Sequence, residues 1–427
     1  FSATSDRPSP ARCPMNLPEL LAPAGNLEKL RLAVYCGADA VYLSGKRYGL
    51  RSHAGNFTLA EIEEGMRHAR ANRVKVYVTV NIIARNDDIA HLPGYLEALG
   101  MLEVDGLIVS DPGIIACARK HAPRLPLHLS TQLSTANWES ALFWQQQGVA
   151  RINLARELSL REVAQIKSKV ACEIEIFVHG AICVAYSGRC LLSTYLAQRE
   201  SNRGECAHPC RWGYALVEEK RPGDYFPVAE DERGSYIFNA KDLCLIEHLP
   251  EVIATGVDAI KIEGRMKGIH YVAGVTRAYR SALDDYRRDP EGFRFRPEWL
   301  EELKRLSHRD YTTGFAFGTP SAADYTYETS ACLRTHELVG VVTDVRMPGA
   351  AGDAPASGSW IGLAVRNRIT RGEWIEFVDR QFTCHGGRIT EMTDEQGGAL
   401  SEAHPNQRVR VKTSLPVGVN DLVRRKK

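Results

Sequence analysis

The chain has 427 residues, of which 44% are hydrophobic and 25% charged, and its formal net charge is +2. These values are typical of a globular protein with a large core and two or three domains. They exclude a strongly basic chain whose overall field attracts nucleic acid, so any such contact must come from local basic patches. No run of about 18 apolar residues occurs, and we therefore expect no membrane-spanning helix.

Residues 1–17 contain no apolar signal core and begin with Phe1 rather than Met, so we expect a flexible leader here. Eleven cysteines in a chain of this length lack the density of a small disulfide-stapled secreted protein. This cysteine usage predicts reduced thiols and a cytoplasmic location.

Residues 18–290 alternate short β-rich runs with amphipathic helical stretches. Two helices are expected to begin at the N-caps Asn26 and Ser159, and two to end at Gly37 and Gly148. The predicted strands are 19–25, 40–45, 75–82, 106–111, 126–133, 151–156, 173–180 and 258–264. Eight strands that each lead to a helix over about 250 residues indicate an α/β fold, a TIM-like (β/α)8 barrel. An open doubly wound sheet usually has fewer strands and a glycine-rich fingerprint after the first one, where this chain has APAGN.

A long insertion, residues 181–257, separates the seventh and eighth predicted strands. Such barrels build their active sites from the loops at the carboxyl ends of the strands, so we expect the chemistry there. Residues 291–334 look like a linking region. Residues 335–427 alternate in strand fashion between glycine-rich turns, which predicts a small C-terminal all-β barrel.

Five cysteines occupy the insertion: Cys183, Cys190, Cys206, Cys210 and Cys244. Thiolates spaced in this way can converge on one soft metal centre, either an iron–sulfur cluster or a zinc ion. Zinc sites usually contain two short C-x2–4-C pairs, and this chain has one short pair. Unrelated buried thiols are the third possibility, which suits scattered cysteines better than five clustered ones.

The seventh predicted strand carries Glu175, Phe177 and His179 at alternate positions, which places them on one face. A carboxylate that points into the barrel needs a partner such as Lys261, and the pair is either catalytic or purely structural. His179 ends the strand at the rim, where it can serve as a proton shuttle or bond to the backbone to shape the turn. Other rim candidates end the remaining strands: Asn81, Asp111, Gln132, Arg156, Glu263 and Arg265.

The run EIEIFVHGAICVAYSGRCLLS closely resembles the signature of the collagenase-like peptidase family of unassigned catalytic type, family thirty-two. Further segments fit the same family in order over residues 18–425: PELLAPAG, GADAVYLSG, NAKDLCLI, IKIEGRMK and SHRDYTTGF. Some members of this family are oxygen-independent hydroxylases of a tRNA wobble uridine, a ribosomal RNA cytidine or a ubiquinone precursor. The segment CRWGYALVEE and the C-terminal β-barrel make the tRNA branch the nearest match.

The resemblance implies a [4Fe-4S] cluster on Cys183, Cys190, Cys206 and Cys244, with Cys210 as an alternative ligand. It also implies prephenate as the source of the hydroxyl oxygen and tRNA as the partner. Prephenate carries two carboxylates, and arginine forks bind carboxylates well. We expect this role for three arginines of the rim and insertion: Arg156, Arg265 and Arg189.

An RNA base must leave its stack to reach such a site, and aromatic side chains can receive it. Tyr186 is a candidate for this stacking or for a hydrogen bond to the cluster sulfurs. Further aromatic candidates are Tyr195, Trp212 and Tyr214, and the candidate phosphate contacts are Arg199, Arg203, Arg211 and the terminal RRKK.

These features predict an enzyme that forms 5-hydroxyuridine at the tRNA wobble position. A peptidase is the alternative that the family name suggests, although the sequence has neither a G-x-S-x-G elbow nor an H-E-x-x-H helix. A peptidase here needs a reactive cysteine paired with His179. A hydroxylase of rRNA or of a ubiquinone precursor, and an RNA-binding protein with a structural metal, are the remaining alternatives.

Overall fold

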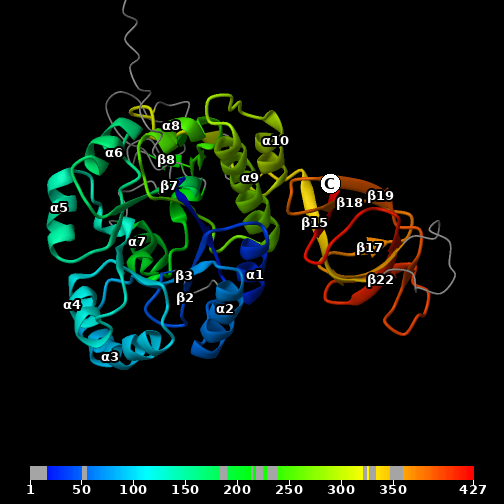
Figure 1. Ribbon diagram of the computed structural model, residues 1–427, viewed down its shortest axis with the longest axis horizontal. Coiled ribbons are helices and arrows are strands. Elements are labelled where there is room, and N and C mark those ends of the chain that lie inside the picture. Colours follow the sequence, from blue (N-terminus) through cyan, green and yellow to red (C-terminus); the bar gives the residue numbers. More distant parts are fainter. Residues whose placement is uncertain are drawn as a thin grey trace, which may run out of the picture.

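The structure, a computed structural model, describes residues 17–50, 55–182, 190–212, 215–217, 225–227, 239–320, 325–326, 333–346 and 359–427. The predicted leader, apart from Leu17, lies outside these residues. A helix-wrapped barrel forms the larger part of the molecule, and a β domain lies beside it (Figure 1). No helix among the described residues combines the length and the hydropathy needed to cross a bilayer.

Eight parallel strands form the barrel, and the pairing of the last with the seventh closes it. The strands are β1 (Glu19–Pro23), β2 (Ala40–Ser44), β3 (Lys75–Val80), β4 (Gly106–Val109), β5 (Leu127–Leu129), β6 (Arg151–Asn153), β7 (Glu173–Ala181) and β12 (Ala259–Ile262). Each coincides with a predicted strand, so the TIM-like (β/α)8 barrel is confirmed. Outward aliphatic side chains of these strands pack under the helices as one large core.

The helices around the barrel are α1 (Leu27–Tyr35), α2 (Leu59–Ala71), α3 (Asn86–Met101), α4 (Pro112–His121), α5 (Trp138–Gln146), α6 (Leu160–Lys167), α8 (Leu249–Ala254) and α9 (Ile269–Arg288). The predicted caps are confirmed, because the Asn26 and Ser159 side chains accept backbone N–H bonds from the first turns of α1 and α6. Gly37 and Gly148 follow their helices with φ of 90° and 70°, a conformation that favours glycine.

The described residues of the insertion between β7 and α8 form short elements: α7 (Leu192–Ala197), η2 (Ser201–Arg203), η3 (Pro209–Arg211), β8 (Ala215–Val217), β9 (Tyr225–Pro227), β10 (Asn239–Ala240), β11 (Asp242–Cys244) and η4 (Ile246–His248). β11 pairs antiparallel with the end of β7 and parallel with β13 (Tyr311–Thr312), so it extends the barrel wall beyond the rim. β10 pairs with β14 (Tyr325–Thr326). The end of the insertion is therefore part of the barrel's own sheet.

After α9 the chain forms α10 (Pro297–Arg305) and then the β domain. Its strands are β15 (His336–Arg346), β16 (Ser359–Val365), β17 (Ile369–Thr370), β18 (Trp374–Val378), β19 (Cys384–Arg388), β20 (Met392–Thr393), β21 (Glu402–Ala403), β22 (Arg408–Thr413) and β23 (Leu422–Lys426). Seven of them form an antiparallel sheet in the order β19-β18-β23-β15-β16-β22-β20. Within the described residues no pairing joins β19 to β20, so the expected closed barrel is a curved half-barrel.

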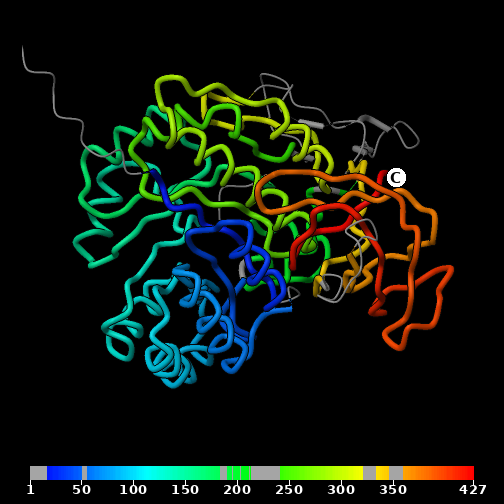
Figure 2. Tube along the Cα trace, turned by 45° about the vertical axis from the view of Figure 1, so that its right-hand side comes forward, coloured from blue at the N-terminus to red at the C-terminus, as the bar shows by residue number. Residues whose placement is uncertain are grey.

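The half-barrel packs on the barrel through a small apolar cluster and several polar bonds (Figure 2). The cluster joins residues of α1 and α9 to residues of β15 and β23: Leu32, Cys36, Ala273, Val341 and Leu422. The Tyr35 hydroxyl also donates to Asp421 at 2.7 Å. These contacts hold the two domains side by side.

Candidate active site at the barrel mouth

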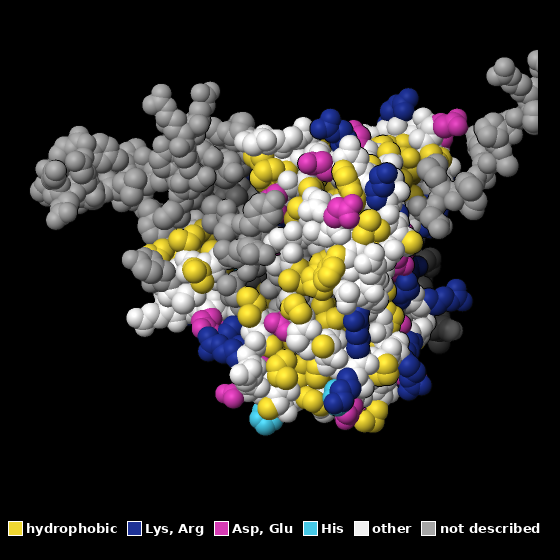
Figure 3. All heavy atoms as spheres, turned by 90° about the vertical axis from the view of Figure 1, so that its left-hand side faces the viewer, with side chains coloured by type: hydrophobic (Ala, Val, Ile, Leu, Met, Phe, Trp, Pro, Cys, Tyr) yellow, Lys and Arg dark blue, Asp and Glu magenta, His cyan; other side chains and the backbone are white. Residues whose placement is uncertain are grey.

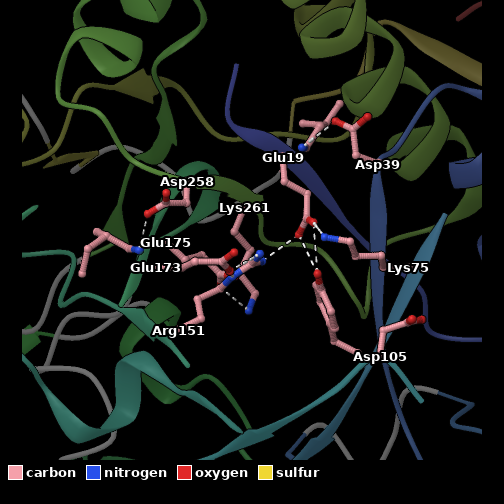
Figure 4. Close-up of polar contacts among 12 residues, drawn as sticks. Glu19, Asp39, Lys75, Asp105, Arg151, Glu173, Glu175, Asp258 and Lys261 are labelled. Carbon is pink, nitrogen blue, oxygen red and sulfur yellow. Dashed lines mark hydrogen bonds and ion pairs between the residues drawn. The ribbon is translucent and has the colours of Figure 1, made fainter. Parts of the chain in front are cut away.

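Glu175 and Lys261 face each other inside the barrel (Figure 4). The Lys261 ammonium nitrogen lies 2.8 Å from a Glu175 carboxylate oxygen, and both side chains are buried. Burial lowers the pKa of Lys261, and the Glu175 carboxylate opposes this shift. The alternation along β7 therefore predicted this partner correctly.

The pair continues into a network of charged side chains at the floor of the barrel (Figure 4). Arg151 is its centre, with nitrogens 2.7 Å from Glu19, 2.7 Å from Glu173 and 3.5 Å from Glu175. Glu19 also accepts hydrogen bonds from Lys75 and Tyr77. Four of these charged residues, Glu19, Lys75, Arg151 and Glu173, begin their strands. Since the amino ends of barrel strands form the face opposite the active site, this network has a structural role.

Arg151 and its partners Glu19 and Glu173 were not predicted from the sequence. The available signal was a charged residue at the first position of each of four strands. Charged residues are also common at solvent-exposed strand ends, and local sequence does not show which strand ends converge.

His179 does not share the inward face of Glu175 and Phe177, contrary to the prediction. Along β12 the pairing with β7 shifts, with Phe177 opposite Lys261 but His179 opposite Ile262. One extra residue in β7, Val178, therefore forms a β-bulge, and a bulge reverses the alternation of side chains. His179 instead packs outside the barrel wall.

Three tyrosine rings surround His179, those of Tyr271, Tyr279 and Tyr311, at centroid distances of 5.4 to 5.9 Å. The residue is 1% exposed, and neither ring nitrogen has a hydrogen-bond partner in the part of the chain that is described. Burial lowers the pKa of His179 from 6.5 to about 3. At neutral pH the imidazole is thus uncharged, and no described residue makes the bond between its ring and the rim backbone that was one of the two predicted roles.

The carboxyl ends of the strands gather several predicted polar residues at the mouth. Arg265 follows β12, is buried, and donates from its guanidinium to the Thr79 hydroxyl at 3.0 Å. Asn81 donates from its side-chain amide to Gln132 at 2.7 Å. Asp111, by contrast, is the N-cap of α4, because its side chain accepts a hydrogen bond from the Ile114 backbone N–H. This bond gives Asp111 a structural role.

Arg156 follows β6 and lies against the interior ring of Phe177. Its guanidinium carbon is 3.8 Å from the ring centroid, and Nη1 donates to the Ala181 carbonyl at 2.5 Å. The Lys261 ammonium lies 5.5 Å from the same ring, so two cations flank it. Arg156 and Arg265 therefore both border the interior of the barrel, where a dianionic ligand can meet them.

Three of the five predicted cysteine ligands lie in one lobe of the insertion that packs on the rim. The segments around Cys190 and Cys206 are joined by Ser201, which donates to the Cys190 carbonyl, and by Ser193, which accepts from Ala207. η3, which contains Cys210, packs against α7. Cys183, Tyr186 and Arg189 lie outside the described residues, as does Tyr214.

The lobe is attached to the barrel by a cation that sequence analysis assigned to RNA. Arg203 lies 2.8 Å from Asp88 in α3 and also pairs with Glu200. Trp212 is exposed, but the side chains of Tyr195 and Arg211 are not described. Arg203 is therefore bound within the protein, where it holds the lobe on the rim.

Cys244 lies on β11, directly opposite His179. Burial raises the pKa of its thiol to about 12. Among the described residues, no three His, Cys, Asp or Glu side chains are placed to hold a metal ion. The four-ligand set stays a prediction, because Cys183, one of its members, lies outside the described residues.

The same geometry argues against a cysteine peptidase built on His179. A reactive cysteine needs a lowered pKa beside a histidine that can accept its proton. The cysteine opposite His179, Cys244, has a raised pKa, and the His179 imidazole resists protonation. In this pair the cysteine resists losing its proton and the histidine resists accepting one, which is the opposite of what a nucleophilic cysteine needs.

Both domains of the chain match a known protein family. Residues 25–326 match peptidase family U32, and residues 334–424 match the peptidase family U32 C-terminal domain. The "tRNA hydroxylation protein P1" of Bacillus subtilis is 43% identical over 411 residues, covering 96% of this chain and 95% of that protein. The "tRNA hydroxylation protein P" of Escherichia coli is 37% identical over 430 residues, 91% of each chain. A 23S rRNA 5-hydroxycytidine synthase of Escherichia coli is 38% identical over 266 residues, 62% of this chain and 39% of that protein. This chain belongs to peptidase family U32.

Proposed function

We propose that this chain is an RNA-modifying hydroxylase that forms 5-hydroxyuridine at the wobble position of tRNA. The observation that carries this proposal is similarity over both domains to two proteins named for tRNA hydroxylation, at 96% and 91% coverage of this chain. The similarity to the rRNA synthase covers only 62% of this chain. With tRNA as its substrate, the enzyme works in the cytoplasm.

The mouth of the barrel suits the binding of a dicarboxylate and a flipped base. Arg265 and Arg156 border the barrel interior from β12 and β6, and guanidinium groups bind carboxylates through paired hydrogen bonds. Asn81 and Gln132 add amide groups that can bond to the edge of a base. We therefore propose that prephenate binds at the two arginines, together with Arg189, and that the uridine enters beside it.

We further propose a [4Fe-4S] cluster on Cys183, Cys190, Cys206 and Cys244, with Cys210 as the alternative to Cys206. Four thiolates are the usual ligands of such a cluster. Support comes from the lobe, in which the segments that carry Cys190, Cys206 and Cys210 pack on one another. Anaerobically purified protein is expected to contain about four iron atoms per chain. A Cys190→Ala variant should lose most of this iron, whereas Cys36→Ala, a buried helix-end thiol outside the lobe, should retain it.

Mass spectrometry of nucleosides from a strain that lacks this chain tests the reaction. The tRNA fraction should lose 5-hydroxyuridine and its derivatives, and the wild-type chain should restore them while Cys190→Ala should not. 5-Hydroxycytidine in the rRNA of the same cells should stay unchanged. Unchanged tRNA together with lost 5-hydroxycytidine would reassign the substrate to rRNA.

A further inference from the structure

A cleft of about 550 Å³ lies between the barrel rim and the half-barrel. Its walls come from the start of α1, the loop between β12 and α9, Ser307, and the segments around β15 and β16 of the half-barrel. Because residues from both domains line it, the cleft exists only when the half-barrel is docked. Nothing in the proposed chemistry at the barrel mouth uses this cleft.

The cleft is rich in positive charge. Four cationic side chains line it, Lys29, Lys267, Arg334 and Arg366, and Glu28 is the only acid among the described residues of its wall. Glu28 is already paired with Arg366. Lys29 donates to the backbone carbonyl of Arg265, and Lys267 donates to that of Ser307. Because a carbonyl group is uncharged, neither bond neutralises the lysine. The wall therefore retains a net positive charge that an anion can neutralise.

The amino end of the longest barrel helix opens into the same cleft. Helix α9 has 20 residues, and Gly268 to Tyr271 at its start line the cleft. In the described structure no side chain caps this end, and no acidic residue lies in its first turn. The first backbone N–H groups of a helix lack partners within the helix, and its dipole favours an anion there. The four cations and the helix end thus converge on one place.

The cleft also adjoins the barrel mouth. Arg265 points its guanidinium to Thr79 at the mouth, and the next residue, Met266, lines the cleft. Lys29 donates to the Arg265 carbonyl at 3.4 Å, which joins the cleft wall to the mouth. The opposite face of the barrel is different, with hydrophobic side chains over its middle and scattered charges of both signs (Figure 3).

We propose that this interdomain cleft binds a backbone phosphate of the RNA substrate while a neighbouring base enters the barrel mouth. The inference rests on the proposed function, because the partner must be a polyanion that also reaches the mouth. A phosphate takes hydrogen bonds from helix N-termini and charge from Lys and Arg, and such contacts fix register without reading sequence. The half-barrel thereby forms the second wall of an RNA-binding site, opposite the wall formed by the barrel.

Gly268 offers a matched pair of variants to test this. A Cβ atom built there has no described heavy atom within 4 Å, and its φ of −70° and ψ of 168° suit any residue. Gly268→Asp and Gly268→Asn are nearly isosteric, and both provide a good N-cap, so both should fold with unchanged or slightly raised stability. Only the aspartate adds a negative charge where the phosphate is expected.

The measurement is the Kd of each full-length variant for tRNA at several salt concentrations. Gly268→Asp should raise the Kd roughly ten-fold and lower the slope of log K against log salt by about 1, while Gly268→Asn stays within about two-fold of wild type. Arg334→Glu should weaken binding in the same way. Arg161→Glu, an equal charge change on exposed α6 across the barrel, should not.

Equal tRNA affinity for the two Gly268 variants would overturn the inference, and so would weakening by Gly268→Asp at a salt slope identical to wild type. If inorganic phosphate binds wild type but not Gly268→Asp while their tRNA affinities agree, the cleft is a free-anion site and the inference is wrong. If any of these results is obtained but the wild-type protein still modifies tRNA, the inference about the cleft is wrong and the proposed function stands. Wild-type protein that neither binds nor modifies tRNA would remove both.

Discussion

The Glu175 carboxylate lies 2.8 Å from the Lys261 ammonium nitrogen and opposes the lowering of the Lys261 pKa by burial. The two residues are not equally replaceable, since Arg151 lies 3.5 Å from Glu175 and would still pair with it if Lys261 were lost. Glu175→Gln, however, leaves two buried cations with one fewer anion. Removing one partner of a buried pair is far costlier than removing both.

We therefore expect Glu175→Gln to destabilise the protein by about 3 kcal/mol and Lys261→Met by about 1 kcal/mol. The double variant should be more stable than the sum of the two losses implies, because it leaves neither charge unpaired. Denaturant unfolding of the four proteins measures this. Strictly additive losses would mean that the pair does not hold the barrel interior together.

His128 lies on β5, with its ring edge against the ring of Tyr77. Burial, and then the positive charges of Arg151, Lys261 and Lys75, hold its pKa well below 6.5. The unfolded chain binds a proton at this histidine below about pH 6.5, whereas the folded chain does not until the pH is much lower. The contribution of His128 to stability is therefore complete above pH 6.5 and is lost as the pH falls below it.

Between pH 6.5 and 5, this residue should account for a loss of about 1.4 kcal/mol per pH unit in the free energy of unfolding. His128→Gln, which stays neutral, should remove that part of the slope. His91→Gln on the exposed surface of α3 should leave the slope unchanged. Thermal unfolding across this pH range is the measurement, and an identical slope for His128→Gln would show that the floor tolerates the protonated ring.

At the scale of elements, β7 shows which features the sequence makes predictable. Its span and the inward direction of Glu175 followed from local alternation, which depends on residues two positions apart. Lys261 is 86 residues away, and it was predicted as the partner because a buried carboxylate needs a cation. The bulge at Val178 depends on the register against β12, more than eighty residues away, and no local pattern encodes it. The inward direction predicted for His179 was wrong for that reason.

The same distinction holds for other elements. Helix caps such as Asn26 and Ser159 were predictable because each bonds to a backbone group three residues on. The floor network was not, because Glu19 and Arg151 are 132 residues apart and meet only when the barrel closes. The interdomain cleft was equally hidden, since its wall combines Lys29 with Arg334 and Arg366 from the other domain.

For the whole molecule, the joint between the domains is an ion network around Arg424. This side chain is 0% exposed and bonds to Glu302 of α10 at 2.7 Å and to Glu376 of β18 at 2.8 Å. Burial raises the pKa of Glu302, but Arg277 and Arg424 outweigh it and bring the pKa to about 2. Arg277 also donates to the Asp379 carbonyl of the half-barrel. The cleft that we assign to RNA depends on this joint, because it exists only between docked domains.

Arg424→Ala should therefore uncouple the two domains. It removes the cation between Glu302 and Glu376 and should cost about 3 kcal/mol, concentrated at the joint. Calorimetry should then resolve two unfolding transitions where the wild type shows one, and the tRNA Kd should rise as the cleft opens. Arg425→Ala is the matched control, because Arg425 pairs with Glu337 and Glu373 inside the half-barrel and should lower that domain's stability without splitting the transition. A single transition in Arg424→Ala with unchanged tRNA affinity would mean that the apolar contacts of Leu32, Ala273 and Leu422 suffice to hold the domains together.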